Sequence, residues 1–145
     1  MRSKRLQPGD RDLARVLFAL MADVFEEACE VLSDRYLDQL LAREGVWRSL
    51  RTAVIIGGIT AHSLPMTRTE TAEMFIYDLA VRRDHQRTGV GRHLVADLQE
   101  KAAARGIENL FVAADNGDVH ALDFYRALGG AASPVTLFDF AHRGK

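Results

Sequence analysis

The sequence predicts a mixed α/β domain built around one sheet, and three observations support this class. Apolar runs rich in β-forming residues alternate along the chain with amphipathic runs at helical spacing. A length of 145 residues is typical of one domain, so we expect a single domain over residues 1–145. A strand-like run, a glycine-containing loop and a helix-like run also follow one another at residues 74–105.

The N-terminal third predicts one short strand and two helices. The strand is expected at residues 3–7, and a turn then leads to Asp10 as the N-cap of a helix that ends near Glu27. A second helix begins at Ser33, and Gly45 stops it. Both helices carry apolar residues at helical spacing: Leu13, Val16, Leu17, Leu20, Met21 and Val24 in the first, and Tyr36, Leu37, Leu40 and Leu41 in the second.

The rest of the chain predicts five further strands and two helices. The strands are expected at residues 46–50, 53–64, 73–81, 109–114 and 135–140. The helices are expected at Val90–Arg105 and from the N-cap Asp118 to Gly129. The pair Gly57-Gly58 inside the second of these strands indicates a bulge or a close approach of another backbone.

Bulk composition excludes several classes of function. The net charge is −1, which implies no general attraction to nucleic acid or to a membrane surface. No apolar stretch reaches the length of a membrane span, and no apolar segment follows the basic N-terminus, so we expect a cytoplasmic protein without a signal peptide. Cys29 is the only cysteine, and it is expected to be a small buried residue. The five histidines show no metal-ligand spacing, so we expect no metal site.

Charge is unevenly distributed along the chain. Residues 10–38 hold eight acidic and three basic residues, whereas residues 82–105 hold six basic and three acidic residues. The acidic region suits a cationic partner, with Glu26 and Glu27 as candidate substrate-binding residues, and the basic region suits a phosphorylated cofactor. The alternative for both regions is a pair of solvated helix faces.

The loop after the 73–81 strand carries the clearest chemical signal. It reads Gln-Arg-Thr-Gly-Val-Gly from Gln86 to Gly91. The first backbone N–H groups of a helix have no intrahelical partner, and the helix dipole adds positive charge there, so a phosphate group is favoured. Gly89 and Gly91 allow the backbone to approach a bulky pyrophosphate. An ordinary turn with a helix cap is the alternative, while a dinucleotide loop lacks its third glycine because Leu94 occupies that position.

The pattern Gln-x-x-Gly-x-Gly after a strand ending Leu-Ala-Val resembles the acetyl-CoA loop of the GNAT superfamily of N-acetyltransferases. Residues 118–129 also resemble that family's Asn-x-x-Ala-x-x-x-Tyr-x-x-x-Gly segment, with Asp118 in place of Asn. The resemblance implies a central, mostly antiparallel twisted sheet of six or seven strands, flanked by about four helices, and acetyl-CoA as co-substrate. It implies that acetyl-CoA contacts Leu79, Ala80, Val81, Gln86, Arg87, Thr88, Gly89, Val90, Gly91, Arg92 and Tyr125.

The same resemblance implies direct acetyl transfer in a ternary complex, without an acetylated enzyme. Tyr125 is the candidate general acid, because the leaving thiolate needs a proton that a phenol can supply. A core aromatic on an amphipathic helix is the alternative for this residue. The attacked carbonyl needs donors for its developing negative charge, and the family places a backbone N–H of the central strand there, here within residues 79–81.

A narrower resemblance points to the type I aminoglycoside 3-N-acetyltransferases. Residues 76–81, 114–118 and 137–140 carry it, and it implies acetylation of the 3-amino group of an aminoglycoside antibiotic, hence resistance, by a homodimer. Asp78 is the candidate base or amine-binding carboxylate, with a strand residue paired to an arginine as the alternative. Charge-assisted bonds to a polycationic substrate are expected from further residues. These candidates are Tyr77, Asp115, Asp118 and Asp139.

Two other functions stay open. One is a GNAT acetyltransferase for another amine, such as a polyamine or a peptide N-terminus, since acidic residues suit all of these acceptors. The other is a non-catalytic acetyl-CoA-binding module, against which Tyr125 and Asp78 argue, because a sensor needs neither. The segment 46–53 is short and basic where the family has a longer apolar hairpin, so its effect on the sheet and the pocket is a separate question.

Overall fold

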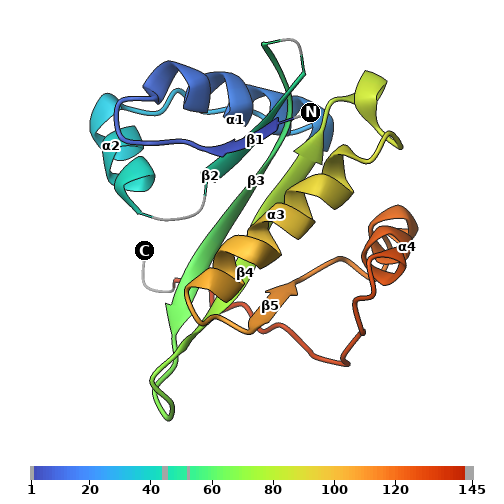
Figure 1. Ribbon diagram of the computed structural model, residues 1–145. Coiled ribbons are helices and arrows are strands. Elements are labelled where there is room, and N and C mark those ends of the chain that lie inside the picture. The colour runs from blue at the N-terminus through green and yellow to red at the C-terminus, as the bar shows by residue number, and fades with distance from the viewer. Residues whose placement is uncertain (1, 44–45, 52, 143–145) are drawn as a thin grey trace. The chain divides into compact units, whose positions relative to one another are not determined.

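The computed structural model describes residues 2–43, 46–51 and 53–142, and the chain divides into two compact units, residues 1–113 and 114–145. The first unit holds a five-stranded sheet in the order β1-β2-β3-β4-β5 (Figure 1). Its strands are β1 (Arg2–Arg5), β2 (Val46–Arg51), β3 (Val54–Pro65), β4 (Ala72–Val81) and β5 (Asn109–Val112). The helices are α1 (Arg11–Phe25), α2 (Asp34–Ala42) and α3 (Val90–Ala104), with a short 3-10 turn η1 (Arg83–His85), and the second unit carries α4 (Val119–Ala127).

The sheet is mostly antiparallel, as expected. The pairs β1–β2, β2–β3 and β3–β4 are antiparallel, and only β4–β5 is parallel. The mixed α/β class and the four helices of the described chain are confirmed, but the expectation of six or seven strands was wrong. The predicted strand at 135–140 is absent, since residues 130–142 have no regular structure. A strand needs a partner ladder for its backbone groups, and among the described residues none pairs with this segment.

The basic segment 46–51 forms an inner strand of the sheet, with a partner strand on each side. β2 pairs with β1 over four residues and with β3 over six, with one register shift between Ser49 and Leu50. The departure of residues 46–51 from the family pattern therefore leaves the order of the sheet intact, while residue 52 lies outside the described residues.

Helices cover both faces of the sheet (Figure 1). α1 and α2 pack on one face, where Leu17, Leu37 and Leu41 form a buried cluster with Ile55 and Ala80. α3 covers the other face. Its buried side chains are Val90, Leu94, Val95, Leu98 and Ala102. Each fully buried aliphatic side chain of this kind stabilises the fold by about 1.5–3 kcal/mol, so the sheet is a rigid platform for the residues at its ends.

The helix caps show where local sequence set the boundaries. Ser33 caps α2 as predicted, since its Oγ accepts a hydrogen bond from the N–H of Tyr36 at 3.1 Å. Asp10 is at the N-cap position of α1, but its carboxylate accepts from the N–H of Gln7 at 2.7 Å instead of from the helix. α1 ends at Phe25, close to the predicted end. The predicted stop of α2 at Gly45 lies outside the described residues.

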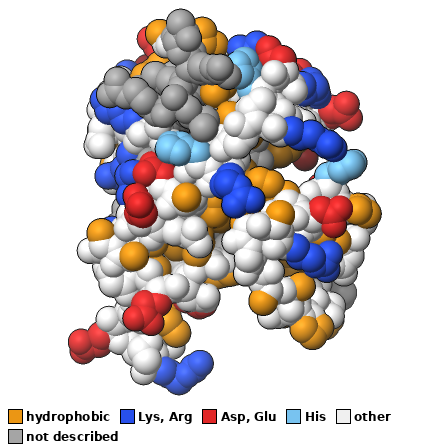
Figure 2. Space-filling model, turned by 45° about the vertical axis from the view of Figure 1, so that its right-hand side comes forward, with side chains coloured by type: hydrophobic (Ala, Val, Ile, Leu, Met, Phe, Trp, Pro, Cys, Tyr) orange, Lys and Arg blue, Asp and Glu red, His pale blue; other side chains and the backbone are white. Residues whose placement is uncertain are grey.

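Charged side chains of both signs are mixed on the surface. Figure 2 shows acidic and basic side chains interspersed on one face rather than gathered into areas of a single sign. Among the described residues, no helix is both long enough and apolar enough to cross a membrane.

Candidate active site

The strand β4 carries a one-residue bulge at Tyr77. Thr60 of β3 faces Asp78, whereas the next residue, Ala61, faces Ile76, so Tyr77 has no residue opposite. Consecutive side chains of a regular strand point to opposite faces, and a bulge removes this restriction. Tyr77 and Asp78 therefore line one and the same pocket. The N–H of Asp78 donates to the Oγ1 of Thr60 at 3.1 Å, which anchors the backbone beside the bulge.

The edge of β4 toward β5 is open over its second half. Parallel pairing begins at Glu73 with Asn109 and ends at Ile76 with Val112, the last residue of β5. β4 continues to Val81, so the five residues after Ile76 have no neighbouring strand on this edge within the described first unit. Those of their backbone N–H and C=O groups that point to this edge and make no bond within the chain can pair with an extended ligand that lies alongside as an added strand.

The loop after β4 leads into α3 through two residues in the left-handed conformation. Arg87 and Gly89 have left-handed φ values of 63° and 89°, and Gly89 is the N-cap of α3. The N–H of His93 makes the first intrahelical bond, to the carbonyl of Gly89 at 3.0 Å. The side chain of Gln86 donates to the carbonyl of Val81 at 3.0 Å and fixes the loop to the end of β4. The N–H groups of the first helical turn consequently point outward, as an anion site requires.

Gly57 is the position where β3 lets α3 come close. A Cβ built on Gly57 would lie 2.9 Å from the carbonyl oxygen of Ala80 and 3.2 Å from a methyl group of Val90. The first distance is shorter than a real Cβ contact, and the neighbour is backbone, which cannot turn aside. The close approach predicted for the glycine pair is therefore confirmed at Gly57. It sets how near the first turn of α3 lies to the open part of β4.

Gly57→Ala is expected to lower the free energy of unfolding by about 1–3 kcal/mol, because an overpacked site must move the backbone of β4 or the start of α3. The same movement is expected to weaken binding of acetyl-CoA, the co-substrate that the sequence resemblance implies. Thermal or urea unfolding gives the first quantity, and calorimetric titration with CoA gives the second. A variant with wild-type stability and affinity would contradict this account of Gly57.

A pocket of about 510 Å³ opens between α1, the loop at residues 26–32 and the bulge of β4. Its lining combines apolar, aromatic and acidic side chains. The lining residues are Phe18, Met21, Ala22, Phe25, Glu27, Ala28, Cys29, Glu30, Leu32, Tyr77 and Asp78. Tyr77 is 64% exposed and its ring contacts those of His62 and Phe75 edge-on. Carboxylates attract a cationic amine, and aromatic walls can pack against the rings of its carbon skeleton, so this cavity suits a cyclic amine.

Asp78 has the electrostatics of a proton acceptor. Its side chain is partly buried, and this burial is the main cause that raises the pKa of its carboxyl above the ordinary value for an aspartate. The negative charge of Glu27 raises the pKa of Asp78 further, while His62 acts in the opposite direction. A carboxylate whose pKa is raised takes up a proton more readily than a solvated one, which is what a general base needs.

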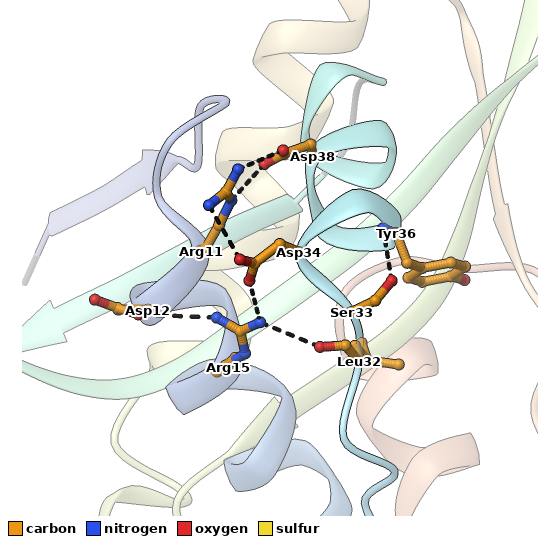
Figure 3. Close-up of polar contacts among 8 residues, drawn as sticks. All are labelled: Arg11, Asp12, Arg15, Leu32, Ser33, Asp34, Tyr36 and Asp38. Carbon is orange, nitrogen blue, oxygen red and sulfur yellow. Dashed lines mark hydrogen bonds and ion pairs between the residues drawn. The ribbon is translucent and has the colours of Figure 1, made fainter.

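The pocket loop is held at its C-terminal end by α1. Arg15 of α1 donates to the carbonyl of Leu32 at 3.1 Å and to the carboxylate of Asp34 at 2.6 Å (Figure 3). The loop itself has no regular secondary structure between residues 27 and 33. Its position beside the pocket therefore depends on such side-chain contacts rather than on a backbone ladder.

The sequence matches the profile described as the Acetyltransferase (GNAT) family over residues 14–129. This chain belongs to that family. The match extends over both units, from α1 to the end of α4. In Bacillus subtilis (strain 168), the uncharacterized N-acetyltransferase YvbK is 35% identical over 63 residues, which are 43% of this GNAT chain and 39% of YvbK. The chain therefore aligns with well under half of that relative's length.

Two solved structures resemble the GNAT chain over nearly its whole length. Both are aminoglycoside acetyltransferases from uncultured soil metagenomic samples. HMB0005 is 30% identical, with 98% of each chain covered and a TM-score of 0.91. Meta-AAC0020 is 31% identical in its complex with sisomicin, with 98% of this chain and 96% of that chain covered and a TM-score of 0.92.

Part of the acidic surplus predicted near the N-terminus of this GNAT chain is paired internally. Arg11 donates to both carboxylate oxygens of Asp38, at 2.7 and 2.6 Å, and lies 3.3 Å from Asp34 (Figure 3). This hydrogen-bonded guanidinium lowers the pKa of Asp38 below its ordinary value. Glu26 lies 3.9 Å from Arg83 and does not line the pocket. The carboxylates that do line it are Glu27, Glu30 and Asp78.

The second unit contains the other candidates. Tyr125 is on α4, where its ring contacts that of Phe124 edge-on at 5.1 Å between centroids. Asp118 is the N-cap of α4, as predicted, and accepts from the N–H of Ala121 at 3.1 Å. Asp115 accepts from the N–H of Gly117 at 2.7 Å, which forms a turn. The last candidate is Asp139, in the segment without regular structure.

Sequence reasoning did not assign several residues that line the pocket of the GNAT chain, among them Glu30 and Cys29. Glu30 was counted only in the regional charge, although it lies three residues after Glu27 in the same loop. Cys29 was expected to be buried, but it is exposed and lines the pocket. The expectation was wrong because Cys29 lies in a loop without regular structure, where its side chain is exposed. The segment Glu-Glu-Ala-Cys-Glu-Val, without helical periodicity, was the available signal for a surface loop.

Proposed function

We propose that this chain is an acetyl-CoA-dependent N-acetyltransferase that acetylates the 3-amino group of aminoglycosides and so confers resistance. The observation that supports this most directly is the acidic pocket at the bulge of β4, where Asp78 has a raised pKa beside the open strand edge. Membership of the GNAT family supports the reaction. Identities of 30–31% with two aminoglycoside acetyltransferases, over nearly the full chain, support the acceptor class.

The residues of the first unit fit acetyl-CoA, which supplies the activated acetyl group. The open edge at residues 77–81 offers backbone groups to its extended arm, and the left-handed Gly89 turns the first N–H groups of α3 outward for the pyrophosphate. Gly57 leaves room for α3 to approach β4. Cofactor contacts are therefore proposed for the residues named from the sequence: Leu79 to Val81 and Gln86 to Arg92.

Asp78 is proposed as the base for the attacking amine. An amine enters the pocket as an ammonium ion, and Glu27 and Glu30 favour that charge. Asp78 takes one proton, which leaves a neutral amine with a lone pair. The new C–N bond then forms as the C–S bond of the thioester breaks. A backbone N–H within residues 79–81 donates to the carbonyl oxygen as its negative charge develops.

Tyr125 is proposed as the general acid that protonates the leaving thiolate. The nitrogen loses its second proton as the amide forms, and this proton restores the phenol of Tyr125, while Asp78 releases the first proton to solvent. Asp115, Asp118 and Asp139 are proposed to bind further ammonium groups of the substrate. Two of these carboxylates already accept a backbone hydrogen bond in the second unit, which leaves further acceptor positions on each.

The deciding experiment measures thiol release from acetyl-CoA with a panel of amines: gentamicin, sisomicin, kanamycin, spermidine and a short peptide. We expect turnover with gentamicin and sisomicin, and acetyl mapped by mass spectrometry and NMR to the 3-amino group. Turnover only with spermidine or the peptide would replace the aminoglycoside by another amine. Binding of CoA without turnover of any amine would favour a non-catalytic module.

The organisation of the chain follows from the same proposal. We propose one functional domain over residues 1–145, since the family match runs through both units, and a homodimer in solution, on the sequence resemblance alone. A single cooperative unfolding transition is expected by calorimetry. Light scattering at micromolar concentration is expected to give twice the chain mass, and a monomer at every concentration would remove the dimer.

A further inference from the structure

One arginine joins the start of the proposed cofactor loop to the end of α1. Arg83 opens η1, and its guanidinium donates to the carboxylate of Asp23 at 2.9 Å and to the backbone carbonyl of Asp23 at 2.7 Å. The same guanidinium lies 3.9 Å from the carboxylate of Glu26. Asp23 is in the last turn of α1, where a cation is also favoured by the helix dipole.

The backbone that carries Arg83 is fixed to the sheet. The N–H of Arg82 donates to the carbonyl of Ile56 on β3 at 2.8 Å, and the side chain of Gln86 returns to the carbonyl of Val81 at 3.0 Å. The guanidinium of Arg83 therefore extends from a defined point at the end of β4. It reaches α1 across 60 residues of sequence.

The end of α1 is also a wall of the pocket. Ala22, Phe25 and Glu27 line the pocket on this side, and Tyr77 and Asp78 line it from β4. The separation of these two walls determines how an amine lies against Asp78. At its terminal turn, α1 is closed by two backbone bonds, from the N–H of Glu26 to Asp23 at 3.1 Å and from the N–H of Glu27 to Ala22 at 2.9 Å. The hydrogen bonds of Arg83 add to these and tie the first wall to the end of β4.

We infer that Arg83 is a positioning residue for the amine acceptor, and that it acts through the end of α1 rather than on the cofactor. This inference rests on the function proposed above. Loss of the guanidinium releases the wall that carries Phe25 and Glu27, while the cofactor loop keeps its own anchors at Gln86 and Gly89. The KM for the amine therefore rises and the KM for acetyl-CoA does not.

The test is steady-state kinetics of Arg83→Gln with sisomicin as the varied amine. We expect the KM for sisomicin to rise about threefold to tenfold, a range suited to a partly exposed charged pair, with the KM for acetyl-CoA within twofold of wild type. Arg83→Lys keeps the charge and one donor, and is expected to recover part of the loss. Arg82→Gln is the matched control, because the pairing of the Arg82 side chain within the described residues is with Asp84 of its own turn, at 2.8 Å.

A double-mutant cycle with Asp23→Asn sharpens the assignment. Asp23→Asn removes the carboxylate but keeps the backbone carbonyl, so its effect on the KM for sisomicin is expected to be smaller, and the double variant is expected to match Arg83→Gln alone. A raised KM for acetyl-CoA with an unchanged KM for the amine would instead place Arg83 in the cofactor site. Wild-type kinetics in Arg83→Gln would overturn the inference, whereas inactivity of the wild-type protein toward every amine would overturn the proposed function itself.

Discussion

Asp78→Asn is expected to lower kcat for aminoglycoside acetylation by about two to four orders of magnitude, the range typical of losing a general base. The amide has the same shape as the carboxyl group but cannot take the proton from the ammonium ion. Binding of acetyl-CoA is expected to stay within twofold, because the cofactor contacts proposed for residues 79–81 are made by the backbone. Stopped-flow thiol release and calorimetric titration separate these two quantities.

The pH profile distinguishes a base from a carboxylate that only binds. Burial and the charge of Glu27 raise the pKa of Asp78, and only the ionised form accepts a proton, so kcat/KM in wild-type protein is expected to rise with pH through this raised pKa. In Asp78→Asn, kcat/KM is expected to show no such rise with pH. Glu30→Gln is the comparison within the same pocket. It is expected to raise the KM for the amine and to keep the rise of kcat/KM with pH. An unchanged profile in Asp78→Asn would exclude Asp78 as the base.

The free energy of unfolding is expected to change with pH in the direction opposite to kcat/KM. The pKa of Asp78 is higher in the folded than in the unfolded chain, so the folded state binds this proton more tightly. The free energy of unfolding therefore falls as pH rises from the unfolded to the folded pKa, and the charge remains a cost above that range. Asp78→Asn removes this cost, so the variant is expected to unfold at a higher temperature than wild type at pH 7.

Tyr125→Phe is expected to lower kcat by about two orders of magnitude or more, because the phenol is the proposed proton donor to the leaving thiolate. Phenylalanine keeps the ring that contacts Phe124. Calorimetric titration with CoA is expected to give a dissociation constant close to the wild-type value. Full turnover by Tyr125→Phe would remove Tyr125 from the mechanism.

Tyr36→Phe is the matched control for that substitution. Tyr36 is on α2, is 53% exposed and does not line the pocket, so loss of its hydroxyl is expected to leave kcat unchanged. A similar loss in both variants would point to a general effect of removing a tyrosine hydroxyl. A loss confined to Tyr125→Phe assigns the effect to its position on α4.

Elements with local determinants could be predicted from the sequence. The cap at Ser33 depends on a hydroxyl three residues before the N–H that it accepts from, and the start of α3 depends on Gly89 in its left-handed conformation. The close approach at Gly57 could be predicted as one of two alternatives, because a glycine inside an apolar strand usually marks either a bulge or a close approach of another backbone. These features need no knowledge of residues distant along the chain.

Features that depend on distant partners could not be predicted in this way. The segment 135–140 has the composition of a strand, yet strand formation requires a ladder partner, and composition does not supply one. The bulge at Tyr77 arises from the register between β3 and β4, which the sequence of β4 does not contain. The bonds from Arg83 to Asp23 join positions 60 residues apart, so the regional charge balance showed only that both signs were present.

The way the pocket loop is held affects which substitutions can accumulate during evolution. Residues 27–31 lie between two fixed ends, one held by Arg83 at Asp23 and the other by Arg15 at Leu32. Substitutions between these ends disturb neither the sheet nor the cluster of α1 and α2, so they carry little folding penalty. Four of the five residues nevertheless line the pocket. Under the proposed function, selection by a new antibiotic is therefore expected to change these five residues before it changes β4 or the loop at Gly89.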